Sequence, residues 1–195
     1  MTDLQKAIQH FKKNDSILFS VYKDGNIKQL KPIKKEQYFA NLCESIVYQQ
    51  LSGKAASTIY SRFEALFSKK EITAKKILKI SDEKFRSVGL SQQKTKYIKS
   101  LAQHTLDKEL DFDKFNKLSD EEIAEQLIKV KGIGPWTAEM FLMFGLARPN
   151  VFSKGDLGIR NGMKKLYGKE LSDKRIEKWS PHKTYACLLL WKSVD

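Results

Sequence analysis

The chain has 195 residues, of which 41% are hydrophobic and 11% aromatic. This is enough apolar material for one compact domain or two small lobes, and it excludes wholesale disorder. No apolar run approaches the roughly 18 residues of a membrane span, and the charged N-terminal segment lacks a signal-peptide core. The two cysteines, Cys43 and Cys187, are too few for a disulfide framework, a four-cysteine zinc site or an iron–sulfur cluster. We expect an intracellular protein, cytoplasmic in a prokaryote or nuclear in a eukaryote.

The charge balance points to a polyanionic partner. Lys and Arg total 36 against 23 Asp and Glu, which gives a formal net charge of +13. The lysines are spread along the whole chain, so the charge belongs to the folded surface rather than to a tail. Nucleic acid is the leading interpretation, because neutralised phosphates release counterions. A merely solubilising surface is the alternative, and charge by itself does not decide between the two.

Helical periodicity dominates the first half of the chain. Residues 16–22 (SILFSVY) are the one good candidate for a strand. Over 36–50 the apolar residues recur at intervals of three and four, which places them on one face of an amphipathic helix. A further helix is predicted over 54–67. The apolar face of the 36–50 helix consists of Phe39, Leu42, Cys43, Ile46 and Val47.

Capping residues indicate where the later helices begin. Ser81 and Ser91 are typical N-caps of two helices. Ser119 and Glu122 have the spacing of a capping box, in which each residue bonds the backbone of the other. The last helix is predicted over 181–191. Without internal repeats or linkers, the sequence predicts an all-α fold of many short helices and tight turns.

A glycine-containing turn lies between two of these predicted helices. Gly132 and Gly134 flank Ile133, and Pro135 suits the first turn of a helix that runs to about residue 144. The missing side chains allow a ligand close to the backbone, and the amides at the helix start form an anion site suited to phosphate. The alternative is an ordinary helical hairpin whose glycines only permit the turn. The net charge favours phosphate.

Four segments in order resemble the helix-hairpin-helix DNA glycosylase superfamily, and most closely its 3-methyladenine DNA glycosylase II branch. The hairpin segment 130–138 (VKGIGPWTA) is followed by a loop at 151–160 (VFSKGDLGIR) that resembles the catalytic loop of the family. Upstream, 46–52 (IVYQQLS) and 86–91 (RSVGLS) are similar to two further family segments. Lys131 departs from the proline that most members have. Several ordered motifs make coincidence an unsatisfactory explanation.

The resemblance covers nearly the whole chain and implies its architecture. It predicts a two-lobed helical glycosylase domain over 1–195, with the active-site cleft between the lobes. One lobe is expected at about 36–144, and it contains the hairpin at about 121–144. The other lobe is expected to combine 1–35 with 145–195.

Asp156 is the predicted catalytic residue, because it lies in the catalytic loop 22 residues after Gly134. Breaking an N-glycosidic bond builds positive charge on the deoxyribose. A carboxylate in a dry site stabilises this charge, or deprotonates the attacking water, without a metal ion. By position alone, Asp156 is instead a typical helix N-cap. The two roles are compatible.

Two absences indicate a monofunctional enzyme. Family members with lyase activity carry a nucleophilic lysine where this chain has Trp136, which cannot form a Schiff base. Lys154 is close to Asp156 in sequence and is the one exception to consider. Several relatives also hold an iron–sulfur cluster near the C-terminus, where this chain has only Cys187. We therefore expect no iron–sulfur cluster and no required cofactor.

The resemblance also implies a pocket for a flipped base. The π-face of an indole attracts a cationic base, and flat apolar side chains can stack on any purine. The implied pocket residues are Trp136, Met140 one helical turn further on, Trp191, and Tyr48 from another side. The alternative is that Trp191 and Tyr48 are large core residues.

Flipping a base requires a side chain to fill the gap in the duplex. By resemblance this wedge follows Tyr48, which makes Gln50 or Leu51 the candidate; the alternative is that the glutamines there only cap a helix end. The family's hairpin also tends to hold one monovalent cation, here through the backbone carbonyls of Ile128, Val130 and Ile133. The residues that the resemblance places against DNA are Gln49, Gln50, Leu51, Ser52, Lys131, Gly132, Gly134, Thr137 and Lys154.

We therefore expect a monomeric, monofunctional glycosylase of base excision repair that acts on damaged double-stranded DNA and not at a membrane. It would flip alkylated purines of the 3-methyladenine and 7-methylguanine type, hydrolyse their glycosidic bond and leave an abasic site. One alternative is a non-catalytic DNA-binding module that keeps only the hairpin. Another is a glycosylase of the same fold for a different damaged base. Hypoxanthine and 1-methyladenine remain open as substrates.

Overall fold

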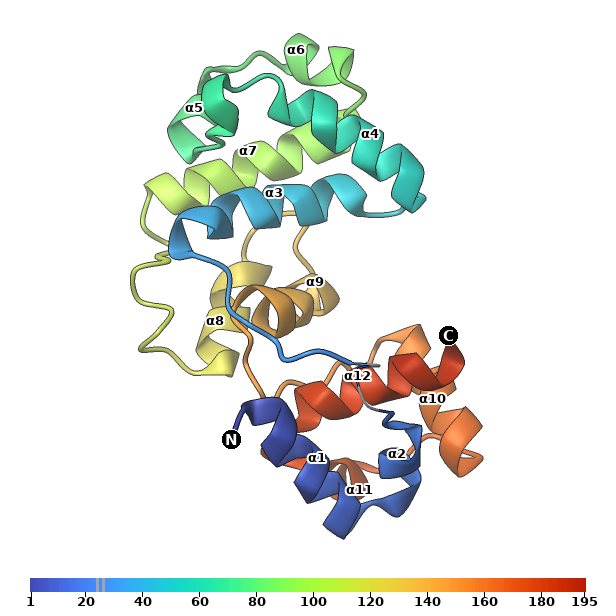
Figure 1. The fold of residues 1–195 in the computed structure, drawn as a ribbon. Coiled ribbons are helices and arrows are strands. Elements are labelled where there is room, and N and C mark those ends of the chain that lie inside the picture. Colours follow the sequence, from blue (N-terminus) through green and yellow to red (C-terminus); the bar gives the residue numbers. More distant parts are fainter. Residues whose placement is uncertain (24, 26) are drawn as a thin grey trace. The chain divides into compact units, whose positions relative to one another are not determined.

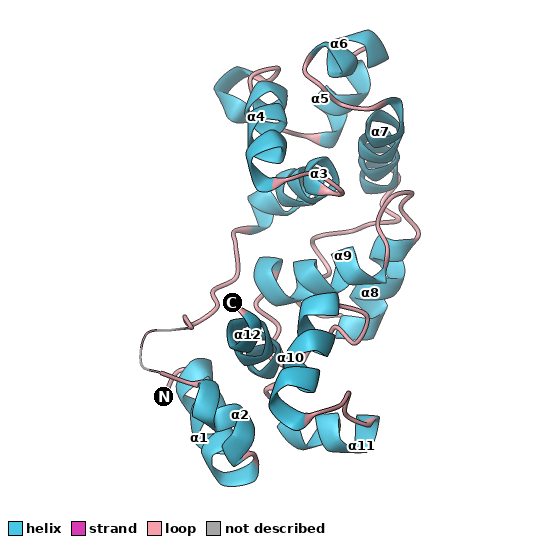
Figure 2. Cartoon of the chain, turned by 90° about the vertical axis from the view of Figure 1, so that its right-hand side faces the viewer, coloured by secondary structure: helices cyan, strands magenta, loops and turns pink. Residues whose placement is uncertain are grey.

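The computed structural model describes residues 1–23, 25 and 27–195. Every regular element among them is helical, as Figure 2 shows, and this confirms the all-α prediction. The chain divides into two compact units, each with its own core: unit 1 comprises residues 1–32 and 139–195, and unit 2 comprises residues 33–138. In the described residues, no helix is both long and apolar enough to cross a bilayer.

Unit 2 is built around a long helix, α7 (Gln92–Leu106), which packs against three other helices of this unit. In Figure 1, α7 runs beside α3 (Tyr38–Tyr48), and both views agree on this. The other helices are α4 (Gly53–Glu64), α5 (Ala74–Lys79), α6 (Asp82–Ser87), α8 (Asp120–Ile128) and the first part of α9 (Pro135–Met140), with 3-10 turns at Lys35–Gln37 and Ser68–Lys70.

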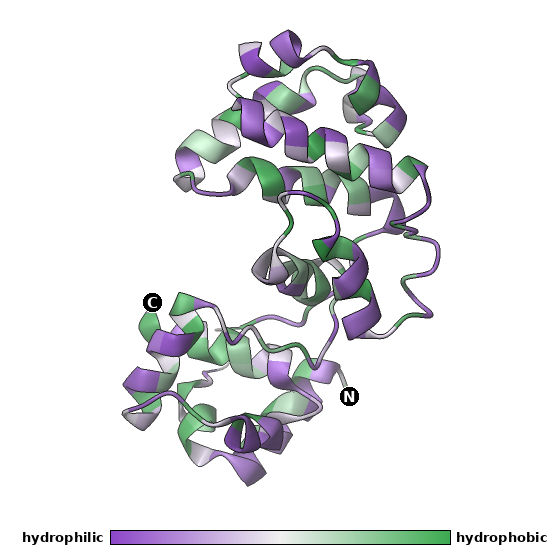
Figure 3. Cartoon of the chain, turned by 180° about the vertical axis from the view of Figure 1, so that it is seen from behind, coloured by the Kyte–Doolittle hydropathy of each residue, from purple (hydrophilic) through white to green (hydrophobic). Residues whose placement is uncertain are grey.

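Hydrogen-bonded caps begin α6, α7 and α8 where the sequence predicts them. The hydroxyls of Ser81 and Ser91 accept backbone N–H groups at 3.3 and 3.2 Å. Ser119 and Glu122 form a complete capping box, with distances of 3.1 and 2.7 Å. These bonds satisfy N–H groups that lack an intrahelical partner. Figure 3 shows the alternation of hydrophobic and hydrophilic residues along such helices, each of which buries one apolar face.

Unit 1 combines the two ends of the chain. Its helices are α1 (Asp3–Asn14), α2 (Ser16–Val21), a π-helical turn at Phe141–Gly145, α10 (Leu157–Tyr167), α11 (Asp173–Ile176), the 3-10 turn Glu177–Trp179 and α12 (Lys183–Val194). The last of these, α12, packs against α10 and α2. The N-terminal segment is thus joined to the C-terminal helix within one core.

The predicted strand at 16–22 is wrong, because Ser16–Val21 forms the helix α2. Asp15 caps this helix, and its Oδ1 accepts the backbone N–H of Leu18 at 3.1 Å. Leu18 is fully buried. A cap and a buried side chain therefore outweigh the strand preference of the aromatic and β-branched residues in this segment.

The Asp15 carboxylate joins four parts of unit 1 in its core. Only 3% of Asp15 is exposed. Its Oδ2 accepts hydrogen bonds from the Tyr167 hydroxyl at 3.0 Å, the Arg175 guanidinium at 3.0 Å and the Trp179 indole at 2.8 Å. A buried carboxylate is tolerated only with such partners. This network connects the N-terminal helices with the last turn of α10, with α11 and with the 3-10 turn that follows.

Replacing Asp15 by alanine is expected to lower the free energy of unfolding by about 3 to 5 kcal/mol, because it leaves the buried Trp179 indole, the Tyr167 hydroxyl and the partly buried Arg175 guanidinium without their acceptor. Urea unfolding followed by circular dichroism measures the change. Asp173→Ala is the matched control, because Asp173 is 79% exposed in its pair with Lys154. Its loss should cost less than about 1 kcal/mol. Equal effects of the two substitutions would contradict the role of the buried network.

Candidate functional site

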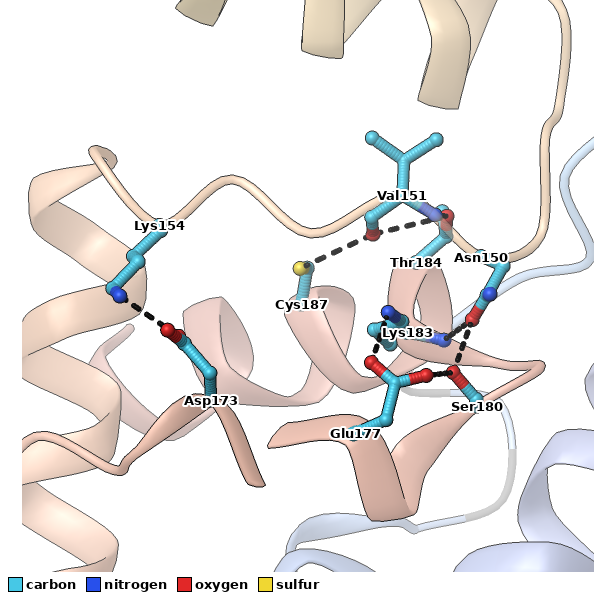
Figure 4. A network of polar contacts seen from close by, with 9 residues as sticks. All are labelled: Asn150, Val151, Lys154, Asp173, Glu177, Ser180, Lys183, Thr184 and Cys187. Atoms are coloured by element: carbon cyan, nitrogen blue, oxygen red, sulfur yellow. Dashed lines mark hydrogen bonds and ion pairs between the residues drawn. The ribbon is translucent and has the colours of Figure 1, made fainter. Parts of the chain in front are cut away.

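The loop before α10 is fixed to the first turns of α12. The backbone N–H of Val151 donates to the Thr184 hydroxyl oxygen at 3.0 Å, and that hydroxyl donates to the carbonyl of Arg148 at 2.6 Å. Figure 4 shows the thiol of Cys187 directed at the Val151 carbonyl, 3.8 Å away. Burial raises the pKa of this thiol. Cys187 is therefore a packing residue of the loop and not a nucleophile.

Figure 4 also shows polar contacts of Asn150 and Lys154 in the same loop. The Asn150 side-chain oxygen accepts from the Ser180 hydroxyl at 3.2 Å and from the backbone N–H of Lys183 at 3.4 Å. Lys154 extends toward α11, where its ammonium pairs with Asp173 at 2.7 Å. The loop that leads to Asp156 is thus held from both sides within unit 1.

Asp156 occupies the N-cap of α10 and contacts α12 through the same oxygen. Its Oδ1 accepts the backbone N–H of Ile159 at 2.9 Å and the indole N–H of Trp191 at 2.7 Å. The side chain is partly exposed. The N-cap interpretation and the catalytic prediction are therefore compatible in this structure, because the cap fixes the orientation of the carboxylate. The indole adds a second donor that an ordinary cap does not need.

Trp191 is positioned by two further contacts. A Cβ atom at Gly158 would lie 2.7 Å from Cδ1 of the indole, so only glycine leaves room for the ring there. The ring of Phe144 stacks with the Trp191 indole, with ring centroids 6.0 Å apart and an interplanar angle of 29°. Phe144 is 42% exposed and was not among the predicted pocket residues. Its position one helical turn after Met140 could have indicated it.

A second carboxylate, that of Glu139, also lies close to this site and was missed by the sequence analysis. Its Oε2 accepts the hydroxyl of Ser153 at 2.5 Å, and Ser153 is completely buried. Burial raises the pKa of Glu139; the Ser153 hydrogen bond opposes this shift, and the charge of Asp156 adds to it. Glu139 therefore supports the loop at Ser153, three residues before Asp156.

The glycine hairpin of unit 2 matches the predicted open backbone at Gly134 but not at Gly132, where a side chain of the protein fills the space. Gly132 has φ +90°, and a Cβ atom there would lie 2.2 Å from the ring of Tyr97. At Gly134 a Cβ atom would meet nothing within 4 Å, so the backbone is open to a ligand. The helix α9 begins at Pro135, and Lys131 is exposed beside the turn. This arrangement suits close contact with a phosphate.

A second exposed turn of unit 2 lies at the end of α3. The Gln49 amide nitrogen donates to the carbonyl of Gly132 at 2.8 Å and lies 3.5 Å from the hydroxyl oxygen of Thr137, which is buried. Gln49 therefore braces the hairpin. Gln50 is exposed, and Leu51 is 39% exposed. Both wedge candidates are on the surface, and Ser52 follows them as the N-cap residue of α4.

The remaining predicted pocket residues differ in exposure. Tyr48 is 37% exposed at the end of α3, where its ring meets Tyr60 edge to face. Trp136 is 50% exposed on α9, and Met140 lies four residues later on the same helix face. Trp191 is half-buried in unit 1. None of these aromatic rings is a fully buried core residue.

An all-α fold with a glycine hairpin and a helix-capping aspartate in a fixed loop defines the class of helix-hairpin-helix DNA-repair proteins. Residues 43–180 match the family described as HhH-GPD superfamily base excision DNA repair protein, and the chain belongs to this family. The chain is 33% identical to DNA-3-methyladenine glycosylase 1 of Schizosaccharomyces pombe over 202 residues, covering 99% of this chain and 89% of that protein.

Solved structures show the same relationship. The crystal structure of a DNA-3-methyladenine glycosidase from Bacillus halodurans superposes with a TM-score of 0.84 at 38% identity, covering 95% of this chain and 88% of that one. The S. pombe 3-methyladenine DNA glycosylase, solved in complex with abasic DNA, superposes with a TM-score of 0.80 at 32% identity, covering 96% and 95%. Both likenesses extend over both units of the chain.

Replacing Gly158 by alanine tests the fit between α10 and the indole. The new methyl group would collide with Trp191, and we expect a loss of about 1 to 3 kcal/mol in the free energy of unfolding. Gly155→Ala is the control, because a Cβ atom there meets nothing within 4 Å. It should change stability by less than about 0.5 kcal/mol. Urea unfolding of both variants measures the difference, and a neutral Gly158→Ala would contradict the proposed fit.

Replacing Glu139 by glutamine tests the raised pKa of this carboxyl group. Burial raises the pKa above the ordinary 4.5, so the stability contributed by the group is complete below that value and is lost as the pH rises through the folded-state pKa. Glutamine does not ionise and keeps an oxygen that can accept from Ser153. The free energy of unfolding of Glu139→Gln relative to wild type should therefore increase as the pH rises above the ordinary 4.5.

The matched control for this experiment is Glu125→Gln, which changes an exposed glutamate on α8. Thermal unfolding of the three proteins across the pH range supplies the comparison. A Glu139→Gln difference that stays constant with pH, or that follows the control, would show that burial of this carboxyl has no consequence for stability.

Proposed function

We propose that this protein is a monofunctional DNA glycosylase that removes alkylated purines of the 3-methyladenine and 7-methylguanine type from duplex DNA. The observation that carries the proposal is the Asp156 carboxylate, oriented by the N-terminus of α10 and by the indole of Trp191. Membership of the base excision repair family supports it, as do relatives that are DNA-3-methyladenine glycosylases.

The chemistry assigned to Asp156 follows from the charge of the transition state. As the bond between C1′ and the purine nitrogen breaks, positive charge develops on the deoxyribose. The carboxylate stabilises this charge or accepts a proton from the water that attacks C1′. A methylated purine that already carries a positive charge leaves with the bonding electron pair as a neutral base. It therefore needs no separate proton donor.

The aromatic residues suit a cationic purine. An indole or phenyl face attracts a cation through its quadrupole, and the attraction is strongest for tryptophan. In unit 1, Trp191 and the stacked Phe144 offer such faces, and in unit 2, Tyr48 and Trp136 do so. We propose that Trp191 and Phe144 of unit 1, the unit that carries Asp156, recognise the flipped base, with Phe144 as an addition to the predicted set.

A lyase step is not part of the proposal. Trp136 stands where lyase members of the family have their lysine, and tryptophan cannot form a Schiff base. Lys154 is the nearest alternative nucleophile, but its ammonium is paired with Asp173 on α11 at 2.7 Å. We propose that the product is an abasic site with an intact strand, and that the protein acts on damaged duplex DNA as a monomer.

The hairpin is the proposed contact to a DNA phosphate. A monovalent cation can be held there by the backbone carbonyls of Ile128, Val130 and Ile133, as the resemblance implies. The Val130 carbonyl accepts the N–H of Ile133 at 3.0 Å, and its second lone pair leaves capacity for a cation. Such a cation would supply positive charge opposite the phosphate. Lys131, exposed beside the turn, supplies charge from the chain itself.

Base release from methylated duplex DNA tests the proposal, with Asp156→Asn compared to wild type at matched DNA occupancy. Asparagine keeps an oxygen that can accept from Ile159 and Trp191 but lacks the charge. We expect the single-turnover rate to fall by about 100-fold or more while DNA binding is retained. Duplexes with 3-methyladenine, 7-methylguanine, 1-methyladenine and hypoxanthine define the substrate range.

If neither protein releases a base from any of these duplexes, yet both bind DNA with a steep salt dependence, the alkylpurine assignment is wrong, and a non-catalytic DNA-binding module or a glycosylase for another damaged base replaces it. If release is as fast in Asp156→Asn as in wild type, Asp156 is only a helix cap. Strand cleavage by the wild type after base release would contradict the monofunctional assignment.

A further inference from the structure

Lys94 directs its ammonium into the protein, at the end of a neighbouring helix. It lies in the first turn of α7, and its Nζ donates to the carbonyls of Val47 at 2.6 Å and Gln49 at 2.7 Å. These carbonyls belong to the C-terminal end of α3, where the last carbonyl groups have no partner within the helix. The half-buried position lowers the pKa of Lys94. An ammonium bonded in this way has two of its three N–H groups committed to carbonyls of the protein.

The turn that this ammonium holds has an unusual backbone. Leu51 N–H donates to the Tyr48 carbonyl at 3.3 Å, which closes a four-residue turn. Gln49 has φ −51° and ψ 131°, and Gln50 has φ +57°. These are the angles of a type II turn, whose third position usually holds glycine or asparagine. With glutamine there, the turn is strained and depends on contacts from its surroundings.

Contacts from α7 and the hairpin provide that support. The Gln49 side chain donates to the carbonyl of Gly132 at 2.8 Å, and the ring of Tyr97 packs against Gly132. Lys94 and Tyr97 lie on the same helix, so α7 contacts both the turn at 48–51 and the glycine hairpin. A pocket of about 400 Å³ is lined by these elements. The turn at 48–51 and the glycine hairpin, the two segments of unit 2 predicted to contact DNA, are thus both contacted by α7.

We propose that Lys94 is a positioning residue for base flipping, which holds the strained turn so that Gln50 and Leu51 are presented to the duplex. This inference rests on the proposed function. The exposed side chains of the turn are those that can enter the base stack, whereas Lys94 itself has its ammonium committed to two carbonyls of the protein. Its loss should therefore impair the flipping step more than the initial binding of DNA.

Lys94→Met removes the ammonium and keeps an unbranched apolar stem of similar length. Lys96→Met is the matched control, because Lys96 is an exposed lysine on the same helix and its loss changes the net charge equally. We expect the single-turnover rate of 7-methylguanine release at saturating enzyme to fall roughly tenfold in Lys94→Met. The variant loses two charge-assisted hydrogen bonds, and water molecules that bond the freed carbonyls offset part of this loss. Affinity for undamaged duplex should equal that of the control.

A fluorescent reporter separates flipping from chemistry. With 2-aminopurine opposite an abasic-site analogue, unstacking by the wild type should raise the fluorescence, and Lys94→Met should lose most of this rise while Lys96→Met keeps it. If Lys94→Met matches wild type in both release and fluorescence, the inference is overturned and the proposed function stands. If Lys94→Met loses affinity for undamaged duplex as much as it loses release, Lys94 is a phosphate contact and the inference is again wrong.

Chemical rescue distinguishes positioning from a folding defect. In Lys94→Cys the introduced thiolate displaces bromide from 2-bromoethylamine, and the new C–S bond restores an ammonium at nearly the original distance. The native thiols of Cys43 and Cys187 are fully buried, and burial raises their pKa, so they do not compete in the folded protein. We expect the alkylated protein to recover most of the fluorescence rise and of the release rate. No recovery in a folded, alkylated protein would overturn the inference. If wild type releases no base, the fluorescence comparison still decides the role of Lys94.

Discussion

The close approach of α10 and α12 is the constraint on which the candidate active site depends. A Cβ atom at Gly162 would lie 2.4 Å from the carbonyl oxygen of Leu190, and one at Gly158 would lie 2.7 Å from Cδ1 of Trp191. These two glycines lie one helical turn apart on α10. They therefore let the backbone of α10 pack directly against the backbone of α12 at Leu190 and against the side chain of Trp191. Only at this separation can the indole N–H reach the carboxylate of Asp156. Packing of apolar surface thus determines the geometry of a polar site.

The same helix, α12, holds the loop that carries Asp156. The Thr184 hydroxyl in its first turn accepts the backbone N–H of Val151 in the loop, and the Trp191 indole in its last turns donates to the Asp156 carboxylate. Helix capping alone would fix Asp156 relative to α10. The contacts to α12 at both ends of the loop remove the remaining freedom, which is what preorganisation of a charge for catalysis requires. Capping and catalysis place compatible demands on the carboxylate, because the hydrogen bonds from Ile159 and Trp191 fix its orientation.

The features predictable from the sequence are those that depend on neighbouring residues. The caps at Ser81, Ser91 and Ser119 and the hairpin start at Pro135 are local chemistry, and the structure confirms them. The helix α2 was not predictable, because the Asp15 that caps it is stabilised by donors more than 150 residues away. Other features were missed for the same reason: the Glu139 contact to Ser153, the Phe144 stack, and the space at Gly158 appear only when distant segments are packed together. The roles predicted for the DNA-contacting residues stay predictions.

The distribution of these features favours catalysis over binding alone. The net charge of +13, the hairpin and the exposed turn at 48–51 are sufficient for a protein that only holds DNA, since phosphate contacts supply affinity without information about the bases. None of them requires a carboxylate held by an indole in unit 1. A carboxylate near bound DNA is electrostatically unfavourable for a simple binding module, because it repels the phosphates. The catalytic role proposed for Asp156 gives this carboxylate a physical purpose, since it would stabilise positive charge on a sugar, and the packing around Gly158 and Trp191 fixes its orientation.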